Sequence, residues 1–171
     1  MTKGGVMKNL ILVPLFILLI VGMTQLTFSD TLSLTIGHVT VIRSGEVNRV
    51  RIWLDISPLH NTRVDYAEIL IPHFLTSGEI VLEGWRLLSE NPSEYDTTYH
   101  ARYATDASVN LLVILDITDF VKYWVENGNN FGILLKRPYY EGGGFRGELQ
   151  GLRNALTNAR IRVFFIPTNR E

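Results

Sequence analysis

Aromatic and charged side chains flank a glycine run near the C-terminal end of the sequence. Aromatic rings stack on the apolar faces of sugars, and a carboxylate or guanidinium group can bond sugar hydroxyls. The sequence therefore predicts a sugar-binding loop, weighed equally against a loop whose aromatic rings simply pack onto the domain. The candidate ligand-binding residues, set around Gly142 to Gly144, are Tyr139, Tyr140, Glu141, Phe145 and Arg146.

Two aspartates occur in the same local pattern, Asp55-Ile-Ser and Asp116-Ile-Thr, at the ends of predicted strands. Each carboxylate can accept backbone hydrogens in the turn that follows its strand. The alternative is an oxygen-ligand calcium site at one rim of the domain. Because calcium sites gather several carboxylates and the acids here are scattered, the turn is favoured. Calcium stays the weaker alternative, and no other cofactor is expected.

Tyr95, Tyr99 and Tyr103 are spaced four residues apart in the polar stretch from Glu90 to Asp106. This stretch reads as a loop with short strand pieces. The three rings are a second candidate for ligand stacking. Packing against the domain is the favoured role.

No motif in the chain points to an enzyme. None of the four histidines stands in a zinc-ligand pattern, and no Gly-x-Ser-x-Gly sequence offers a nucleophile. The glycine run lacks the Lys-Ser/Thr pair of a phosphate-binding loop. A glycan-cleaving pair of carboxylates about 5 to 10 Å apart remains an alternative that the sequence leaves open. We expect a protein that is not an enzyme.

The segment from Leu111 to Lys136 organises the elements that would position these residues. Leu111 to Ile117 is a short apolar run of branched residues, which is typical of a buried strand. Thr118 offers a side-chain oxygen at the start of a helix expected at about 118–127, with Asp119 in its first turn.

The predicted helix has one apolar face, and Asn127-Gly128 is its stop signal. We expect the rings on this face to be core, and Asn130 to bind backbone groups where the helix exits. A strand from Phe131 to Lys136 follows. The apolar face comprises Phe120, Val121, Trp124 and Val125.

Alternating apolar residues predict further strands around this segment. The strongest two-residue period runs from Val50 to Ile56, and the last strand runs from Arg160 to Phe165. An opening strand pair, or one broken strand, spans Leu32 to Val41, and a glycine-rich loop spans Pro138 to Gly151. About eight short strands and one helix predict an all-β sandwich.

The N-terminus reads as a signal peptide. Lys3 and Lys8 precede an apolar run from Leu10 to Met23, which has the length of a signal-peptide core. We predict cleavage after Ser29, which leaves residues 30–171 as one domain; an uncleaved membrane anchor is the alternative. The localisation expected is secretion, to the extracellular space or cell surface, or to the periplasm.

Composition limits the partners. The chain of 171 residues has no cysteine and a net charge of −1. An exported domain of this kind depends on its core, since disulfides are not available to it. Near-neutral charge argues against nucleic acid, which requires a clustered positive surface. Membrane contact is expected only through an uncleaved leader.

Several stretches, in order, resemble the DNRLRE family of domains. Arg51-Ile-Trp-Leu-Asp-Ile-Ser57 is similar to an arginine-led strand of that family, and Val64-Asp-Tyr-Ala67 to its next strand. The best match is Asp116-Ile-Thr118, then Trp124, then Asn130-Phe-Gly132. Two positions depart from the family pattern, Tyr99 in place of a tryptophan and Ala159 in place of a proline.

The resemblance implies a jelly-roll-like antiparallel β-sandwich that serves as a non-catalytic, carbohydrate-binding module. The expected partner is an extracellular or cell-surface polysaccharide. The alternative is a structural component of the surface or envelope that binds protein neighbours and no sugar.

Overall fold

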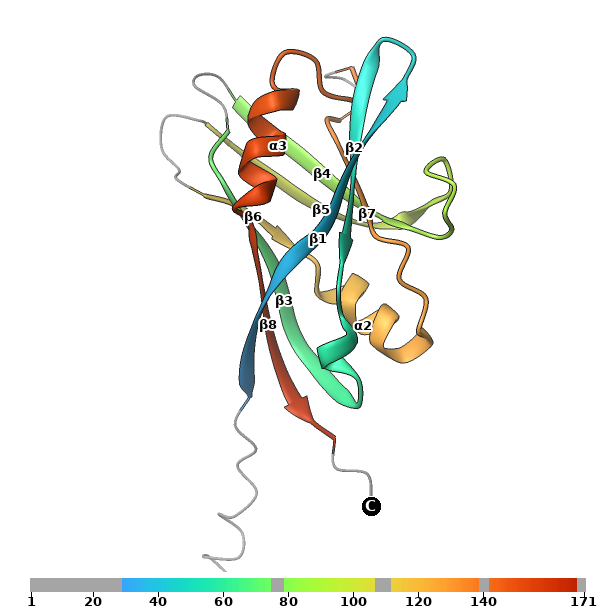
Figure 1. Ribbon diagram of the computed structural model, residues 1–171, viewed down its shortest axis with the longest axis vertical. Coiled ribbons are helices and arrows are strands. Elements are labelled where there is room, and N and C mark those ends of the chain that lie inside the picture. The colour runs from blue at the N-terminus through green and yellow to red at the C-terminus, as the bar shows by residue number, and fades with distance from the viewer. Residues whose placement is uncertain (1–28, 75–78, 107–111, 139–141, 169–171) are drawn as a thin grey trace, which may run out of the picture.

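The computed structural model describes residues 29–74, 79–106, 112–138 and 142–168 (Figure 1). The described chain forms one antiparallel sheet of eight strands in the order β5-β4-β7-β2-β1-β8-β3-β6. The elements are β1 (Asp30–Ser44), β2 (Val47–Leu54), a 3₁₀ turn (Ser57–Leu59), β3 (Thr62–Pro72), β4 (Glu79–Leu87), β5 (Tyr95–Asp106), β6 (Leu112–Asp116), α2 (Thr118–Asn127), β7 (Ile133–Lys136), α3 (Leu149–Thr157) and β8 (Arg160–Pro167). The prediction of an antiparallel β-sandwich is confirmed.

The long strand β1 joins the two layers of the sandwich. Its first half pairs with β8 and its second half with β2, and the register shifts between Ile36 and His38. This β-bulge bends the strand from one layer into the other. Figure 1 shows β1 crossing the molecule diagonally between the two layers. The opening segment is therefore one broken strand, which is one of the two predicted alternatives.

The core fills the space between the layers. Alternate residues of β2, Val50, Ile52 and Leu54, are fully buried, as the two-residue period predicted. Phe120 and Trp124 of α2 join the same cluster, at 3% and 1% exposed, so the prediction that both rings are core is confirmed. Each buried ring of this size removes a large apolar area from water, which is the main stabilising term.

Helix α3 was not predicted. The sequence predicts a single helix, at about 118–127, and a glycine-rich loop from Pro138 to Gly151. Leu152, Ala155 and Leu156 face the core at helical spacing and are buried. The adjacent glycine run made this short stretch look like part of a loop. Helix α3 covers one end of the sandwich (Figure 1).

Strand β5 corrects a second prediction. The stretch expected to be mostly loop holds a strand from Tyr95 to Asp106 that pairs along β4. Its composition is polar because it is the last strand of the sheet, so one long edge and one face meet water. Exposure, and not the lack of a strand, explains the polar sequence.

Strand β6 is also less buried than its apolar sequence predicts. Val113 and Leu115 are fully buried, whereas Leu112 is 43% exposed and Ile114 is 42% exposed. Among the described strands β6 pairs only with β3, and it forms the other edge of the sheet.

The described helices are too short, or not apolar enough, to span a membrane.

Candidate functional site

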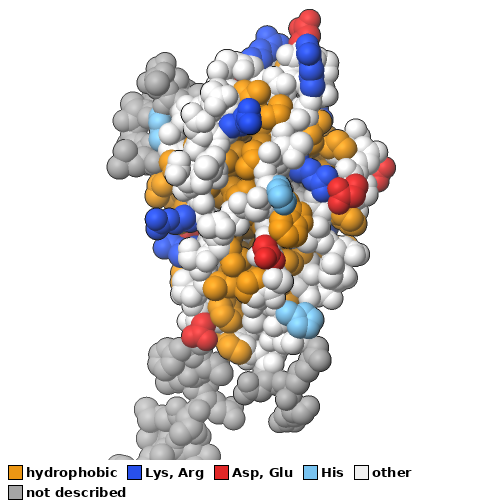
Figure 2. Space-filling model, viewed as in Figure 1, with side chains coloured by type: hydrophobic (Ala, Val, Ile, Leu, Met, Phe, Trp, Pro, Cys, Tyr) orange, Lys and Arg blue, Asp and Glu red, His pale blue; other side chains and the backbone are white. Residues whose placement is uncertain are grey.

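The outer face of the β1–β2–β7–β4–β5 layer carries a row of side chains set by strand register. His100, Trp85, Leu134, Arg51 and Thr40 pair in turn across five strands. Directly paired residues of a sheet share one face, so these side chains lie side by side. Figure 2 shows apolar side chains gathered along one face of the molecule, with charged groups and histidines among them.

A shallow hollow of about 330 Å³ lies on this face, and we name it the tryptophan hollow. Its lining residues are His38, Thr40, Arg51 and Trp53. The His38 and Trp53 rings are 6.1 Å apart and tilted by 44°, so they do not stack on each other. The hollow combines an indole face with a guanidinium group, an imidazole and a hydroxyl.

The β-bulge of β1 seats Trp53. Gly37 lies at this bulge, and a Cβ placed on it would come 2.9 Å from Cε3 of the Trp53 ring. The glycine is needed because the indole packs directly over its backbone. This contact orients the ring at the junction of the two layers.

Arg51 is held in place at the edge of the hollow. Its Nε donates to the carbonyl oxygen of Phe131 at 3.1 Å, and its NH2 lies 2.7 Å from Glu90. The Glu90 side chain is 76% exposed, so its carboxylate can move away from this nitrogen, while NH1 of Arg51 donates to the Glu90 backbone carbonyl at 3.5 Å. Arg51 is therefore positioned by the backbone carbonyls of Phe131 and Glu90 more than by its exposed ion pair.

Trp85, by contrast, is enclosed by its neighbours. His100 stacks on its ring at 4.4 Å with an interplanar angle of 9°, and Tyr95 contacts it edge-on at 5.4 Å. Nζ of Lys136 lies 4.3 Å from the ring centroid, and the indole N–H donates to Glu83 at 3.1 Å. These contacts use the ring faces and the N–H, so Trp85 is a support for the layer.

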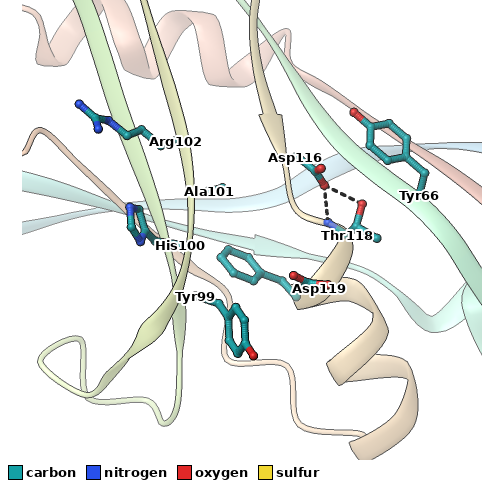
Figure 3. Close-up of a pocket in the computed structure, with 9 residues that line it drawn as sticks. Tyr66, Tyr99, His100, Ala101, Arg102, Asp116, Thr118 and Asp119 are labelled. Atoms are coloured by element: carbon teal, nitrogen blue, oxygen red, sulfur yellow. Dashed lines mark hydrogen bonds between the residues drawn. The ribbon is translucent and has the colours of Figure 1, made fainter.

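The two edge strands β5 and β6 lie side by side along part of their length, and we name the boundary between them the seam. Within the described residues no backbone ladder joins these strands. The Tyr103 hydroxyl donates to the carbonyl oxygen of Leu112 at 3.1 Å and bridges the seam at one end. At the other end lies a hollow of about 400 Å³ between β5, β6 and the start of α2 (Figure 3).

Both walls of the seam hollow carry polar groups (Figure 3). The β5 wall carries Tyr99, which is 57% exposed, together with His100 and Arg102. The opposite wall carries Asp116 at the end of β6 and Asp119 at the start of α2. Packing was the favoured role of the three tyrosines, with ligand stacking as the alternative. Tyr95 packs on Trp85, Tyr103 bridges the seam, and Tyr99 lines this hollow.

Asp116 closes the turn between β6 and α2. Its Oδ1 accepts the Thr118 backbone N–H at 2.9 Å and the Thr118 hydroxyl at 2.6 Å (Figure 3). Asp55 repeats this at the end of β2, where it accepts the Ser57 N–H at 3.0 Å, and that bond lowers the pKa of Asp55. The favoured turn role of both aspartates is confirmed. No group of three or more potential metal-ligating side chains occurs within the described ranges.

Thr118 does not cap the helix, which corrects the prediction. Its Oγ1 lies 3.0 Å from the Ala67 N–H of β3 and accepts that hydrogen. The hydroxyl therefore gives β3 one more hydrogen bond beyond the last residue of β6. Asp116, two residues earlier, supplies the oxygen that the first turn of α2 needs.

Asn130 fastens the exit of α2 to the end of β2. Its Nδ2 donates to the Leu54 carbonyl at 2.7 Å, and its Oδ1 accepts the Gly132 N–H at 3.0 Å. Gly128 ends the helix at φ 73°, with its N–H bonded to Trp124. The predicted stop and the backbone role of Asn130 are confirmed.

A buried carboxylate, Glu68, lies on the β3–β8 layer at 4% exposed. Arg162 binds its Oε1 through two nitrogens, and the Tyr66 hydroxyl donates to Oε2 at 2.9 Å. Burial, followed by the hydrogen bond to Glu68, raises the pKa of Tyr66 to about 12. This set is satisfied internally, which suits a cross-strand link.

A second buried pair links β4, β5 and α2. Arg86 lies 2.5 Å from Asp96, with side chains only 10% and 12% exposed, and its guanidinium group stacks 3.5 Å from the Tyr123 ring centroid. Burial alone would raise the pKa of Asp96. Hydrogen bonds from Arg86 and from the Thr98 N–H outweigh burial and hold the pKa below its usual range.

We expect Asp96→Asn to lower the free energy of unfolding by about 2 kcal/mol at pH 7. A carboxyl whose pKa is lowered in the folded state stabilises it above the unfolded-state pKa, and that contribution is lost as pH falls. Urea unfolding of both proteins should therefore show the difference shrinking below about pH 4. An equal difference at pH 7 and pH 3 would contradict a role for the charge.

The loop predicted to bind sugar divides into three parts. Tyr139, Tyr140 and Glu141 lie outside the described residues, and Arg146 is exposed. Phe145 corrects the prediction, because its side chain is fully buried in the core and offers no free ring face. Its backbone pairs with Asn48 in both directions, at 2.6 and 3.0 Å.

The tryptophan hollow was not predicted from the sequence. Trp53 alternates with buried residues of β2, and that alternation did place it on the outer face. His38 and Thr40 belong to β1 and follow the bulge, so only the pairing of β1 with β2 brings them next to Trp53.

Comparison with known proteins gives no further assignment. No protein-family model matches this chain. No curated protein matches it either. The class that fold and site define is an antiparallel β-sandwich with an aromatic and basic hollow on one face.

Proposed function

We propose that this chain is an exported, non-catalytic module of the DNRLRE type that binds extracellular polysaccharide. The observation that supports the proposal is the tryptophan hollow. An indole ring seated on Gly37 lies beside Arg51, His38 and Thr40 in an open depression. Flat aromatic surface beside a few oriented donors is the arrangement that small polar ligands need.

Each lining residue has a separate part in this proposal. The Trp53 ring stacks on the apolar face of a sugar ring, which gains contact area at little entropic cost. Arg51 donates to ring or hydroxyl oxygens, since its Nε bond to Phe131 leaves the guanidinium group oriented. His38 and Thr40 offer further donors and acceptors at the opposite side.

Three carboxyl groups do not suit the acid role of a glycosidase. Hydrogen bonds lower the pKa of Asp55, and bonds from Ser89 and Asn91 lower the pKa of Glu94. The pKa of Asp96 is lowered as well. A glycosidase acid needs a raised pKa so that it holds a proton at neutral pH. These three groups suit turns and ion pairs.

The test is an array of soluble glycans together with pull-down on insoluble polysaccharides. We expect Trp53→Ala to weaken binding at least about tenfold, because the stacking surface is lost. Trp53→Phe keeps a ring on Gly37 and should retain part of the affinity. A Tyr139→Ala/Tyr140→Ala variant tests the loop predicted from the sequence.

Retained binding in Trp53→Ala, with loss in the double tyrosine variant, would move the site to the loop. No binding of any glycan by the folded protein would reject the proposed function. The candidate that would then lead is protein binding by a structural surface component, which the exposed Leu112 and Ile114 side chains of the edge strand β6 favour.

A further inference from the structure

The hollow beside the seam continues along helix α2. A second hollow of about 330 Å³ lies next to it, and both hollows are lined by Tyr99, Asp119 and Phe120. Figure 3 shows Tyr99 and Asp119 on opposite sides of the space between β5 and α2. We name the two hollows together the helix groove. It shares no lining residue with the tryptophan hollow.

Arg86 brings a buried donor to the second hollow. Its side chain is only 10% exposed, and its NH1 nitrogen is buried without a hydrogen-bond partner among the described residues. NH2 binds Asp96, and the guanidinium carbon lies 3.5 Å from the centroid of the Tyr123 ring. A buried donor without a partner is costly, so a ligand oxygen that reaches NH1 would stabilise the complex.

Asp96 holds Arg86 and Tyr99 in a fixed relation. Its Oδ2 binds Arg86, and its Oδ1 accepts the Thr98 N–H at 2.8 Å. The carboxylate also accepts the backbone N–H of Tyr99. The Tyr99 side chain stays 57% exposed, and within the described residues no other ring contacts it. Tyr99 therefore has an anchored backbone and a ring that is free to stack on a ligand.

The charges along the groove are mixed. Lys122 and Glu126 line the second hollow, and Asp119 lines both hollows. None of these three side chains forms an ion pair or hydrogen bond with the described residues. A charged ligand would meet a like charge here, whereas hydroxyl groups donate to carboxylates and accept from Lys122 or Arg86. The lining therefore suits an uncharged ligand that is rich in hydroxyl groups.

We propose that the helix groove is a second glycan site, which binds an uncharged sugar residue. The Tyr99 ring stacks on the apolar face of the sugar, Asp119 accepts hydroxyl hydrogens, and NH1 of Arg86 donates to a hydroxyl oxygen. This inference rests on the proposed sugar binding for its class of ligand, but not on the tryptophan hollow. With two sites, the apparent affinity for a long polysaccharide can exceed that for a short oligosaccharide.

The probes are the uncharged hexasaccharides of glucose, xylose, mannose and galactose, titrated into the folded protein by calorimetry. The hexasaccharides of glucuronic and galacturonic acid are their charged counterparts. Each probe is measured with the unaltered protein and with Trp53→Ala, which removes the stacking ring of the tryptophan hollow. We expect at least one uncharged probe to bind Trp53→Ala with saturation, and both charged probes to bind it at least about threefold more weakly than that probe.

Substitutions on the rim of the groove localise this binding. In the Trp53→Ala background, Tyr99→Ala should weaken the uncharged probe at least about tenfold, because the stacking surface is lost. Tyr99→Phe keeps the ring and should retain most of the affinity. Asp119→Ala should weaken binding about fivefold through the lost acceptor. Leu88→Ala, the control, truncates an exposed apolar side chain that lines neither hollow, and should change nothing.

Nuclear magnetic resonance locates the sugar without any substitution in the groove. In nitrogen-15 spectra, the uncharged probe should shift the Tyr99 and Asp119 amides and the Nε–H of Arg86, in the unaltered protein and in Trp53→Ala alike. The proposal is overturned if these three resonances stay unchanged, if Tyr99→Ala keeps full affinity, or if a charged probe binds the groove more tightly than every uncharged one.

The same measurements separate failure of this site from failure of the tryptophan hollow. Loss of all probe binding in Trp53→Ala would overturn the second site and leave the tryptophan hollow as the glycan site. Binding that survives Trp53→Ala unchanged but is lost in Tyr99→Ala would support the helix groove and contradict the role of Trp53. A folded protein that binds polysaccharide but shows no probe at the groove also overturns the second site.

Discussion

Gly132→Ala is expected to destabilise the protein by at least about 3 kcal/mol. Gly132 has φ 94°, a backbone conformation that a side chain strains, and a Cβ there would overlap the carbonyl oxygen of Ile52. The overlap is with backbone of the neighbouring strand β2, which cannot rotate away. The carbonyl oxygen of Gly132 also accepts the Leu87 N–H at 3.0 Å.

Gly128→Ala is the matched control for Gly132→Ala. Gly128 also has a positive φ, 73°, but nothing lies within 4 Å of the added Cβ. It should cost only the conformational strain, about 1 kcal/mol. Urea unfolding at one pH measures both. Similar losses for the two variants would mean that β2 and β7 do not approach as closely as this structure has them.

Strain at Gly132 in Gly132→Ala should also disturb the tryptophan hollow. Arg51 donates to the carbonyl oxygen of Phe131, the residue before Gly132. A shift of the chain at Gly132 therefore displaces the anchor of the guanidinium group. If Gly132→Ala still folds, its glycan affinity should fall, whereas that of Gly128→Ala should stay unchanged.

Phe145→Ala is expected to lower the free energy of unfolding by about 3 to 5 kcal/mol. The ring is fully buried in the main core cluster, and truncation leaves a cavity that the neighbouring backbone pairing to Asn48 cannot close. That loss is a large fraction of the roughly 5 to 15 kcal/mol by which domains are typically stable. Thermal unfolding followed by circular dichroism measures the change.

The neighbouring Arg146→Ala is the control. Arg146 is exposed, so its replacement should change stability by less than about 0.5 kcal/mol. A stable Phe145→Ala that loses only ligand binding would restore the role predicted for this residue from sequence. An unstable one supports its place in the core.

Phe145 and Trp53 show why local sequence does not decide which aromatic ring is buried. Phe145 stands between a glycine and an arginine, and Trp53 stands between Ile52 and Leu54. The backbone pairing with Asn48 turns Phe145 inward, and the bulge at Gly37 seats Trp53 on the outer face. Both contacts join residues distant in sequence.

Sequence alone determined the local features of this protein. The two-residue period set the buried face of β2, and the apolar face of α2 placed Phe120 and Trp124 in the core. Asn127-Gly128 marked the end of that helix. Each depends on residues within a turn or two of one another, so neighbouring residue types carry the information.

Only the tertiary structure decided which strands are edges and which residues meet across them. β5 and β6 end the sheet, which explains both a polar strand that resembles a loop and an apolar strand that is half exposed. The tryptophan hollow and the seam each combine residues from separate strands. Strand order is set by the packing of the whole core, and no short stretch of sequence specifies it.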